Sequence, residues 1–102
     1  MSVYNTTYKG LPMQVRTDRY VCGKRFAVVA HSMPDGAYYD DLSINLPDHI
    51  VEDDKCFFVE KEGVSQGFIN HLVECGVVEK TCMEVFYGSF GSVAHQYRWI
   101  LD

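Results

Sequence analysis

Helical periodicity is confined to one segment of this chain, and this restricts the fold to a sheet that carries a single helix. Within residues 65–75, four apolar residues recur at helical spacing: Phe68, Ile69, Leu72 and Val73. Ser65 stands where an N-cap is expected, and Gly76 stands where helices commonly end in a left-handed residue. The sequence therefore predicts one helix at about residues 65–75, with its apolar stripe packed on a sheet.

Most of the remaining chain has the composition of short strands. The predicted strands are residues 3–8, 13–17, 26–30, 38–46, 55–60, 83–87 and 93–101. The first two are expected to form a hairpin, and residues 26–30, apolar on both faces, are expected at the centre of the sheet. The predicted class is α+β: an antiparallel or mixed β-sheet of about six to seven strands with one helix packed on one face.

The length and composition fit one domain spanning residues 1–102. The chain is 47% hydrophobic and 23% charged, and a chain of this size can bury a core without covalent cross-links. Its four cysteines are therefore interpreted as reduced thiols. Because no apolar run approaches the length of a membrane span and the first residues do not resemble a signal peptide, we expect a cytoplasmic protein without membrane association.

The net charge of −5 is unevenly distributed along the chain. Residues 1–34 contain five basic side chains and one acidic side chain, whereas residues 35–102 contain thirteen acidic and four basic ones. The densest charge lies in residues 48–62, where six carboxylates accompany two lysines. Such a segment is typical of a surface that attracts a cationic partner, and a solubilising loop is the alternative.

Turn and core residues give the chain a resemblance to a known family. They lie in residues 26–29, 36–46, 61–63 and 72–78. In this pattern the chain resembles domain of unknown function 4313, a family of short uncharacterised proteins of bacterial mobile elements and prophages. The resemblance implies a mobile-element setting, and it brings no activity and no catalytic residues. Residues 59–65 depart from the family pattern, so no function of that segment is transferred.

The sequence contains no pattern typical of catalysis or metal binding. Among four cysteines and four histidines, no pair has the Cys-x2-Cys or His-x3-His spacing of a zinc site. His71 and Cys75 share a helix face, but we interpret them as flanks of the apolar stripe. Ser89 and Ser92 lie in a glycine loop without the Gly-x-Ser-x-Gly pattern of a nucleophile elbow. We predict that the chain is not an enzyme and has no metal site and no cofactor.

A partner-binding face is predicted from the acidic side chains. Its residues are Asp40, Asp41, Asp48, Glu52, Asp53, Asp54, Glu60 and Glu62. Such a face, flanked by some of the chain's seven tyrosines, is suited to the basic surface of a protein partner. For a protein of a mobile element, that partner is predicted to be a host defence nuclease, which makes the chain an inhibitor of the anti-CRISPR or anti-restriction type.

Two alternatives stay open at this point. One is a protein that binds a small ligand or sequesters a nucleotide, and the other is a structural domain without activity. Direct binding of nucleic acid is disfavoured by the isoelectric point of about 5.2, although four basic residues lie close together in the sequence: Arg16, Arg19, Lys24 and Arg25. Homodimerisation is a further expectation, because the predicted outer strands, residues 3–8 and 92–101, carry little charge.

Overall fold

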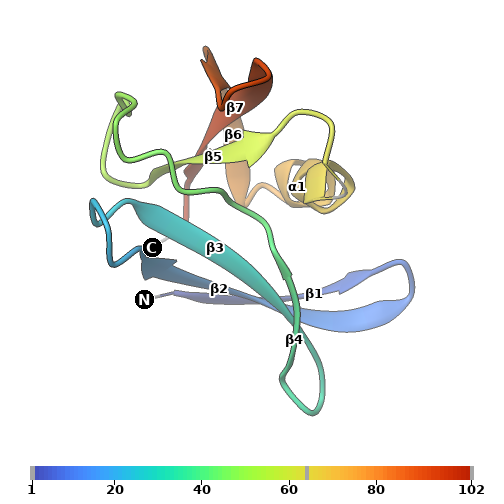
Figure 1. Ribbon diagram of the computed structural model, residues 1–102. Coiled ribbons are helices and arrows are strands. Elements are labelled where there is room, and N and C mark those ends of the chain that lie inside the picture. The colour runs from blue at the N-terminus through green and yellow to red at the C-terminus, as the bar shows by residue number, and fades with distance from the viewer. Residues whose placement is uncertain (1, 64, 102) are drawn as a thin grey trace.

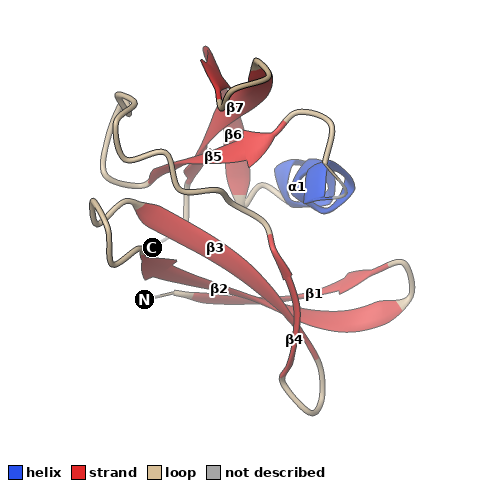
Figure 2. Ribbon diagram, viewed as in Figure 1, coloured by secondary structure: helices blue, strands red, loops and turns tan. Residues whose placement is uncertain are grey.

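The computed structural model, which describes residues 2–63 and 65–101, contains two antiparallel sheets and one helix. The elements are β1 (Val3–Tyr8), β2 (Leu11–Arg19), β3 (Phe26–Ser32), β4 (Ala37–Asp41), β5 (Cys56–Glu60), α1 (Ser65–Glu74), β6 (Val78–Tyr87) and β7 (Ser92–Trp99). The larger sheet has the order β1-β2-β3-β4 and the smaller one β5-β7-β6 (Figures 1 and 2). The predicted α+β class is confirmed, with the strands divided between two sheets.

The β1–β2 hairpin forms as predicted and closes through a two-residue turn. Lys9 and Gly10 both have positive φ, 52° and 78°, which is the geometry of a type I′ turn and matches the twist of the paired strands. Tyr8 therefore pairs with Leu11, and the register continues without interruption to Val3 opposite Arg16. The regular hairpin leaves β1 at the border of the four-stranded sheet.

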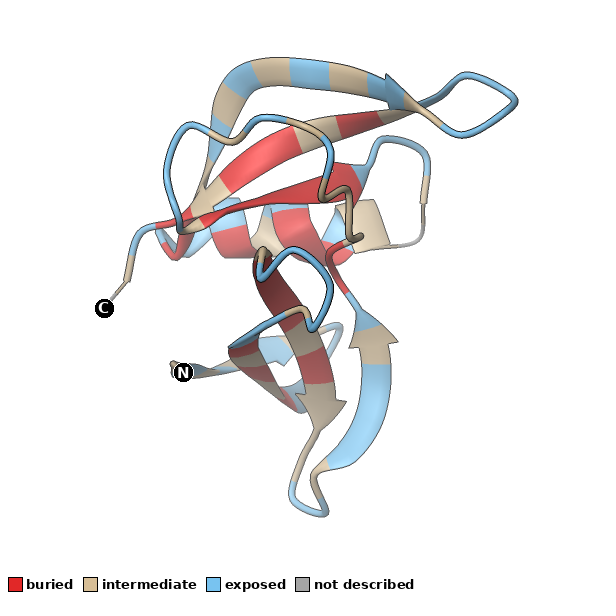
Figure 3. Ribbon diagram, turned by 60° about the vertical axis from the view of Figure 1, so that its left-hand side comes forward, coloured by how far each residue is buried: buried red, intermediate tan, exposed pale blue. Residues whose placement is uncertain are grey.

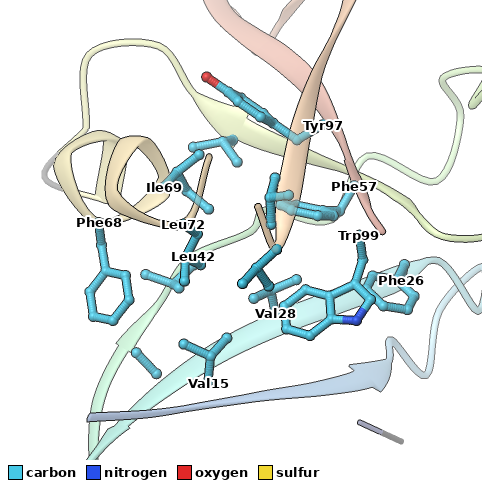
Figure 4. Close-up of a cluster of buried hydrophobic side chains, with 14 of the residues drawn as sticks. Val15, Phe26, Val28, Leu42, Phe57, Phe68, Ile69, Leu72, Tyr97 and Trp99 are labelled. Carbon is cyan, nitrogen blue, oxygen red and sulfur yellow. The ribbon is translucent and has the colours of Figure 1, made fainter. Parts of the chain in front are cut away.

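The two sheets share one hydrophobic core, with α1 closing the gap between them on one side (Figure 1). Figure 4 shows Phe68, Ile69 and Leu72 pointing from α1 towards side chains of both sheets. Trp99 and Phe57 are each 1% exposed and pack against Phe26. Buried positions concentrate on the strands and the helix face that look into this core, whereas β4 is mostly exposed (Figure 3).

The segment that follows β4 crosses from one sheet to the other, and here the predicted strand is wrong. The alternating pattern predicted a strand over residues 38–46, but β4 ends at Asp41. The Leu42 amide donates to the Val28 carbonyl at 2.9 Å, and the Ile44 amide donates to the Phe58 carbonyl, also at 2.9 Å. Two amides that lie two residues apart thus bond to different sheets. The alternation of apolar and polar residues here belongs to a segment that crosses between the sheets and not to a strand of one sheet.

Helix α1 ends where the sequence predicts. Gly76 has a φ of 76°, its amide donates to the Val73 carbonyl at 3.1 Å, and the Val77 amide donates to the Leu72 carbonyl at 3.1 Å. This pair of bonds is a Schellman motif, which satisfies carbonyls that the helix end leaves free. Val73 is 38% exposed, so the apolar stripe is narrower than its spacing predicts.

Strand β7 is the central strand of the three-stranded sheet. The prediction that residues 92–101 form an outer strand is therefore wrong, because both β5 and β6 pair with β7. All four cysteines are free thiols. Within the described residues, the structure has no helix with the length and apolar character needed to cross a membrane.

Candidate functional site

Two adjoining cavities that share Glu60 form a groove where the ends of β4 and β5 meet the β6–β7 turn. Their volumes are about 480 Å³ and about 410 Å³. The first is lined by residues 60–63, Tyr87 and residues 90–93, and the second by Tyr20, residues 40–45, Glu60 and Ser65. We call this the acidic groove, because its acidic side chains are Asp40, Asp41, Glu60 and Glu62.

Two of these carboxylates are held by neighbouring hydroxyl groups. The Tyr87 hydroxyl donates to Glu60 Oε1 at 2.9 Å. The Ser65 hydroxyl, which the sequence placed at the helix N-cap, lies 3.1 Å from Asp40 Oδ2 and 3.1 Å from the Asp41 carbonyl. Ser65 thereby ties the start of α1 to the end of β4, and it fixes one side of the groove.

The acidic groove retains its negative charge. Among the described residues, the ion pairs of the structure do not include its four carboxylates. Lys61 lines the groove, but its Nζ lies 3.6 Å from Glu84 Oε2. Because Lys61 pairs with Glu84, the four carboxylates of the groove have no ion-pair partner among the described residues.

Tyrosine hydroxyls beside the groove remain protonated donors. Burial, reinforced by the Asp41 carboxylate, raises the pKa of Tyr20 above its ordinary value. Desolvation and the Asp41 carboxylate raise the pKa of Tyr38, and desolvation and Glu60 raise the pKa of Tyr87. The groove therefore combines carboxylate acceptors with neutral aromatic rings, a combination that favours a cationic ligand.

The eight predicted acidic residues separate into two groups at opposite ends of β5. Asp40 and Asp41 lie with Glu60 and Glu62 in the groove, whereas the other four lie in the 47–55 loop that precedes β5: Asp48, Glu52, Asp53 and Asp54. Figure 1 shows this loop at the far end of β5 from the turn into α1. The structure thus brings together half of the predicted set.

Two carboxylates of the 47–55 loop are already paired within the chain. Asp53 Oδ2 lies 3.2 Å from Arg98, and Asp54 Oδ2 lies 3.8 Å from Arg19. Asp53 Oδ1 also accepts a hydrogen bond from the Lys55 amide at 2.8 Å. The Lys55 amide, followed by Arg98, lowers the pKa of Asp53. These contacts give Asp53 a role in shaping the loop.

Sequence reasoning expected tyrosines beside the acidic face, and Tyr20 and Tyr87 line the groove, but it missed Phe90. Phe90 is 99% exposed at the tip of the β6–β7 turn, between Gly88 and Gly91, which have φ values of 74° and 69°. Because the turn brings Phe90 and Tyr87 beside Glu60 and Glu62 only in three dimensions, their shared site was hidden in the sequence. An aromatic residue between two turn glycines was the available signal.

Two of the five basic residues of the first 34 positions are engaged in contacts within the chain. Arg19 stacks over the Phe26 ring at 5.2 Å and pairs with Asp54. Arg25 is half-buried and donates to the carbonyls of Pro47 and His49 at 3.3 and 2.8 Å. Because these guanidinium groups are engaged in holding the 47–55 loop, the acidic groove is the stronger candidate for a binding site.

Within the part of the chain that the structure describes, no group of three or more His, Cys, Asp or Glu side chains is arranged to hold a metal ion. No protein-family model, curated protein or solved structure matches the chain. The resemblance to domain of unknown function 4313 therefore stays a prediction, and function is argued from the geometry of the groove.

Proposed function

We propose that the chain is a non-catalytic interaction module whose acidic groove binds a basic surface of a protein partner. The observation that carries this proposal is the presence of four carboxylates around adjoining cavities, without an internal ion pair among the described residues. Holding like charges together costs folding free energy, and a cationic partner relieves that cost.

The geometry favours lysine or arginine side chains as the contacting groups. A cation that enters the larger cavity meets Glu60 and Glu62 together with the rings of Tyr87 and Phe90. A guanidinium group can pair with a carboxylate and stack on an aromatic face at once. Exposed aromatic residues of this kind are common anchors in protein interfaces, so Phe90 is proposed as the central contact.

The biological setting that we propose is the cytoplasm of a host cell that carries a mobile element or phage. Enzymes that act on nucleic acids bind phosphates with basic tracks, and an acidic module can occupy such a track. This makes a host defence nuclease the proposed partner and inhibition of the anti-CRISPR or anti-restriction type the proposed role. The resemblance to the mobile-element family and the charge of the groove support this role.

The alternative of a nucleotide-sequestering protein receives less support from the groove. Phosphates carry negative charge, and the two cavities of the groove are lined by Asp40, Asp41, Glu60 and Glu62. Like charges repel, so a phosphorylated ligand would meet four carboxylates and a single lysine, Lys61, which is paired with Glu84. A basic peptide remains the better match.

We also propose that the chain forms a homodimer through β1. Of the strands that border the sheets, β4 and β6 have register shifts, and β5 is flanked by the bridge between Ile44 and Phe58. Strand β1 is regular and contains neither a charged residue nor proline. Edges with these properties lack the usual protection against pairing with another strand.

The test of the groove uses two variants with the same change in charge. Asp41→Lys with Glu62→Lys alters the groove, and Asp48→Lys with Glu52→Lys alters exposed residues of the 47–55 loop. The probe is a short peptide of arginine and glycine, titrated into the labelled chain and followed by NMR. We expect amide shifts centred on residues 40–41, 60–63 and 87–92, and loss of binding in the groove variant alone.

The same three proteins then serve as baits in a host lysate. We expect the parent and the loop variant to capture one basic protein in stoichiometric amount, and we expect the groove variant not to capture it. Added salt should weaken this binding, because the attraction is electrostatic. Equal binding by both variants, or peptide shifts centred on residues 48–54, would place the interface elsewhere.

A further inference from the structure

A cluster of polar side chains lies between the end of α1 and strand β1, outside the acidic groove. Cys75 is exposed at the end of the helix, and its Sγ lies 3.6 Å from His71 Nε2. The Tyr4 hydroxyl bonds to the same thiol. Two side chains that can donate hydrogen bonds therefore meet at one exposed sulfur.

The imidazole of His71 is held in place from several sides. Its Nε2 lies 2.9 Å from Thr6 Oγ1, and its ring centroid lies 5.4 Å from that of Tyr8 and 6.1 Å from that of Phe68. A protonated Nε2 can share its hydrogen between Thr6 Oγ1 and Cys75 Sγ. The geometry therefore suits an imidazolium that faces a thiolate.

The charged groups around Cys75 act in opposite directions. The helix C-terminus and the neighbouring Glu74 disfavour a negative charge on the sulfur, whereas the donors from His71 and Tyr4 favour it. The bond to the Cys75 thiol raises the pKa of Tyr4, as does burial, so Tyr4 stays a donor when the thiol ionises. An imidazolium partner at contact distance is the arrangement that activates cysteine in many proteins.

We propose that Cys75 is the reactive thiol of this chain and a site of modification by low-molecular-weight disulfides of the glutathione type. His71 Nε2 takes the thiol proton, and the Cys75 thiolate attacks one sulfur of the disulfide. The disulfide bond breaks as the bond to Cys75 forms, and the departing thiolate takes the proton from His71. One disulfide and one protein thiol thus yield a mixed disulfide and one free small thiol.

The other cysteines supply internal references. Cys56 is buried, and burial raises the pKa of its thiol, so it should react slowly. Cys82 is exposed on β6 in the other sheet, and it reports the rate of an accessible thiol. The comparison of Cys75 with Cys82 within one folded chain separates activation from simple exposure.

The experiment labels the full chain with a limiting amount of iodoacetamide and maps the adducts by mass spectrometry over a range of pH. At neutral pH we expect Cys75 to react about tenfold faster than Cys82, because His71 can accept the proton of the Cys75 thiol. The higher rate of Cys75 relative to Cys82 should be lost in His71→Gln, whose amide can still bond to Thr6. The matched control His49→Gln should keep this ratio of rates, and Tyr4→Phe should reduce the ratio in part.

Oxidised glutathione then tests the modification itself. We expect one mixed disulfide, located at Cys75, with release of one equivalent of reduced glutathione. If Cys75 and Cys82 react at the same rate in the parent chain, the proposal is overturned, and this comparison needs no variant to fold. An unchanged rate at Cys75 in folded His71→Gln would equally remove His71 from the mechanism.

Discussion

At the scale of single residues, Gly67 lowers the helix propensity of α1 but leaves room for a contact between α1 and Tyr8 of β1. Glycine in the first turn of a helix costs up to about 1 kcal/mol relative to alanine. A Cβ at this position would lie 2.8 Å from the Tyr8 hydroxyl. Tyr8 packs on Phe68 with ring centroids 4.5 Å apart, so the missing methyl group allows β1 to approach α1.

This close approach predicts coupling between Gly67 and Tyr8. Gly67→Ala alone should not raise the free energy of unfolding, because the new methyl group displaces Tyr8 from Phe68. In a Tyr8→Phe background, which lacks the hydroxyl, the same change should stabilise the chain by about 1 kcal/mol. Urea unfolding of the four proteins of this double-mutant cycle measures the coupling, and additive effects would show that the contact imposes no constraint.

At the scale of elements, helix α1 was predicted well because its signals are local. The spacing of Phe68 and Leu72 and the glycine at position 76 lie within a dozen residues, and the Schellman bonds confirm the predicted end. The crossing at residues 42–44 was not predictable in this way. Leu42 and Ile44 alternate as in a strand, and only the positions of Val28 and Phe58 show that they bond to different sheets.

The acidic groove illustrates the same limit for function. Composition identified Asp40, Asp41, Glu60 and Glu62 as surface charges, but it did not separate them from the acidic residues of the 47–55 loop. Distance along the sequence does not show at which end of a strand a residue lies. The contribution of Phe90 depends on a turn that folds back beside Glu62. Residue type was therefore predictable, and the grouping was not.

The packing of α1 gives the first prediction at this scale. Leu72 is fully buried among residues of both sheets, so Leu72→Ala removes contacts and leaves a cavity. We expect a loss of about 2–5 kcal/mol in the free energy of unfolding. Val73→Ala, on the exposed side of the same helix, is the matched control and should change stability little. Similar melting temperatures for the two variants would show that the helix does not close the core.

The 47–55 loop gives a prediction about pH. Hydrogen bonds from the Lys55 amide and Arg98 hold the pKa of Asp53 below its ordinary value near 3.8. The stabilisation is therefore complete above that value and is lost as the pH falls through the lowered pKa. Asp53→Asn should lower the melting temperature at neutral pH and have a smaller effect in strong acid. Thermal melts of both proteins across this range measure the difference, and a constant difference would contradict it.

At the scale of the whole molecule, the distribution of charge separates two surfaces. The acidic groove lies at the ends of β4 and β5, whereas β1 is free of charge. In a chain of net charge −5, two copies repel each other over most of their surfaces, and this repulsion is weakest where charge is absent. The proposed cationic partner and the proposed second copy would therefore bind to different surfaces of the molecule.

The pairing pattern of the β1–β2 hairpin specifies how two copies would meet. The two-residue turn makes Tyr8 and Leu11 a hydrogen-bonded pair, and the Thr17 amide donates to the Ser2 carbonyl at 2.9 Å. Hydrogen-bonded and non-hydrogen-bonded pairs alternate along an antiparallel ladder. The backbone groups of three residues therefore point away from β2: Val3, Asn5 and Thr7. An antiparallel partner centred on Asn5 would satisfy all of them.

This geometry predicts a symmetric dimer that a single charge can disrupt. Asn5→Lys would place two ammonium groups opposite each other on the two-fold axis, and like charges in direct cross-strand pairs are destabilising. We expect the parent chain to become dimeric as its concentration rises and Asn5→Lys to stay monomeric. The control Ser89→Lys adds the same charge to the exposed β6–β7 turn, and it should dimerise like the parent. Multi-angle light scattering measures all three masses. Since the acidic groove lies apart from β1, the groove variant, Asp41→Lys with Glu62→Lys, should also dimerise. A parent chain that stays monomeric at millimolar concentration would rule out the β1 interface.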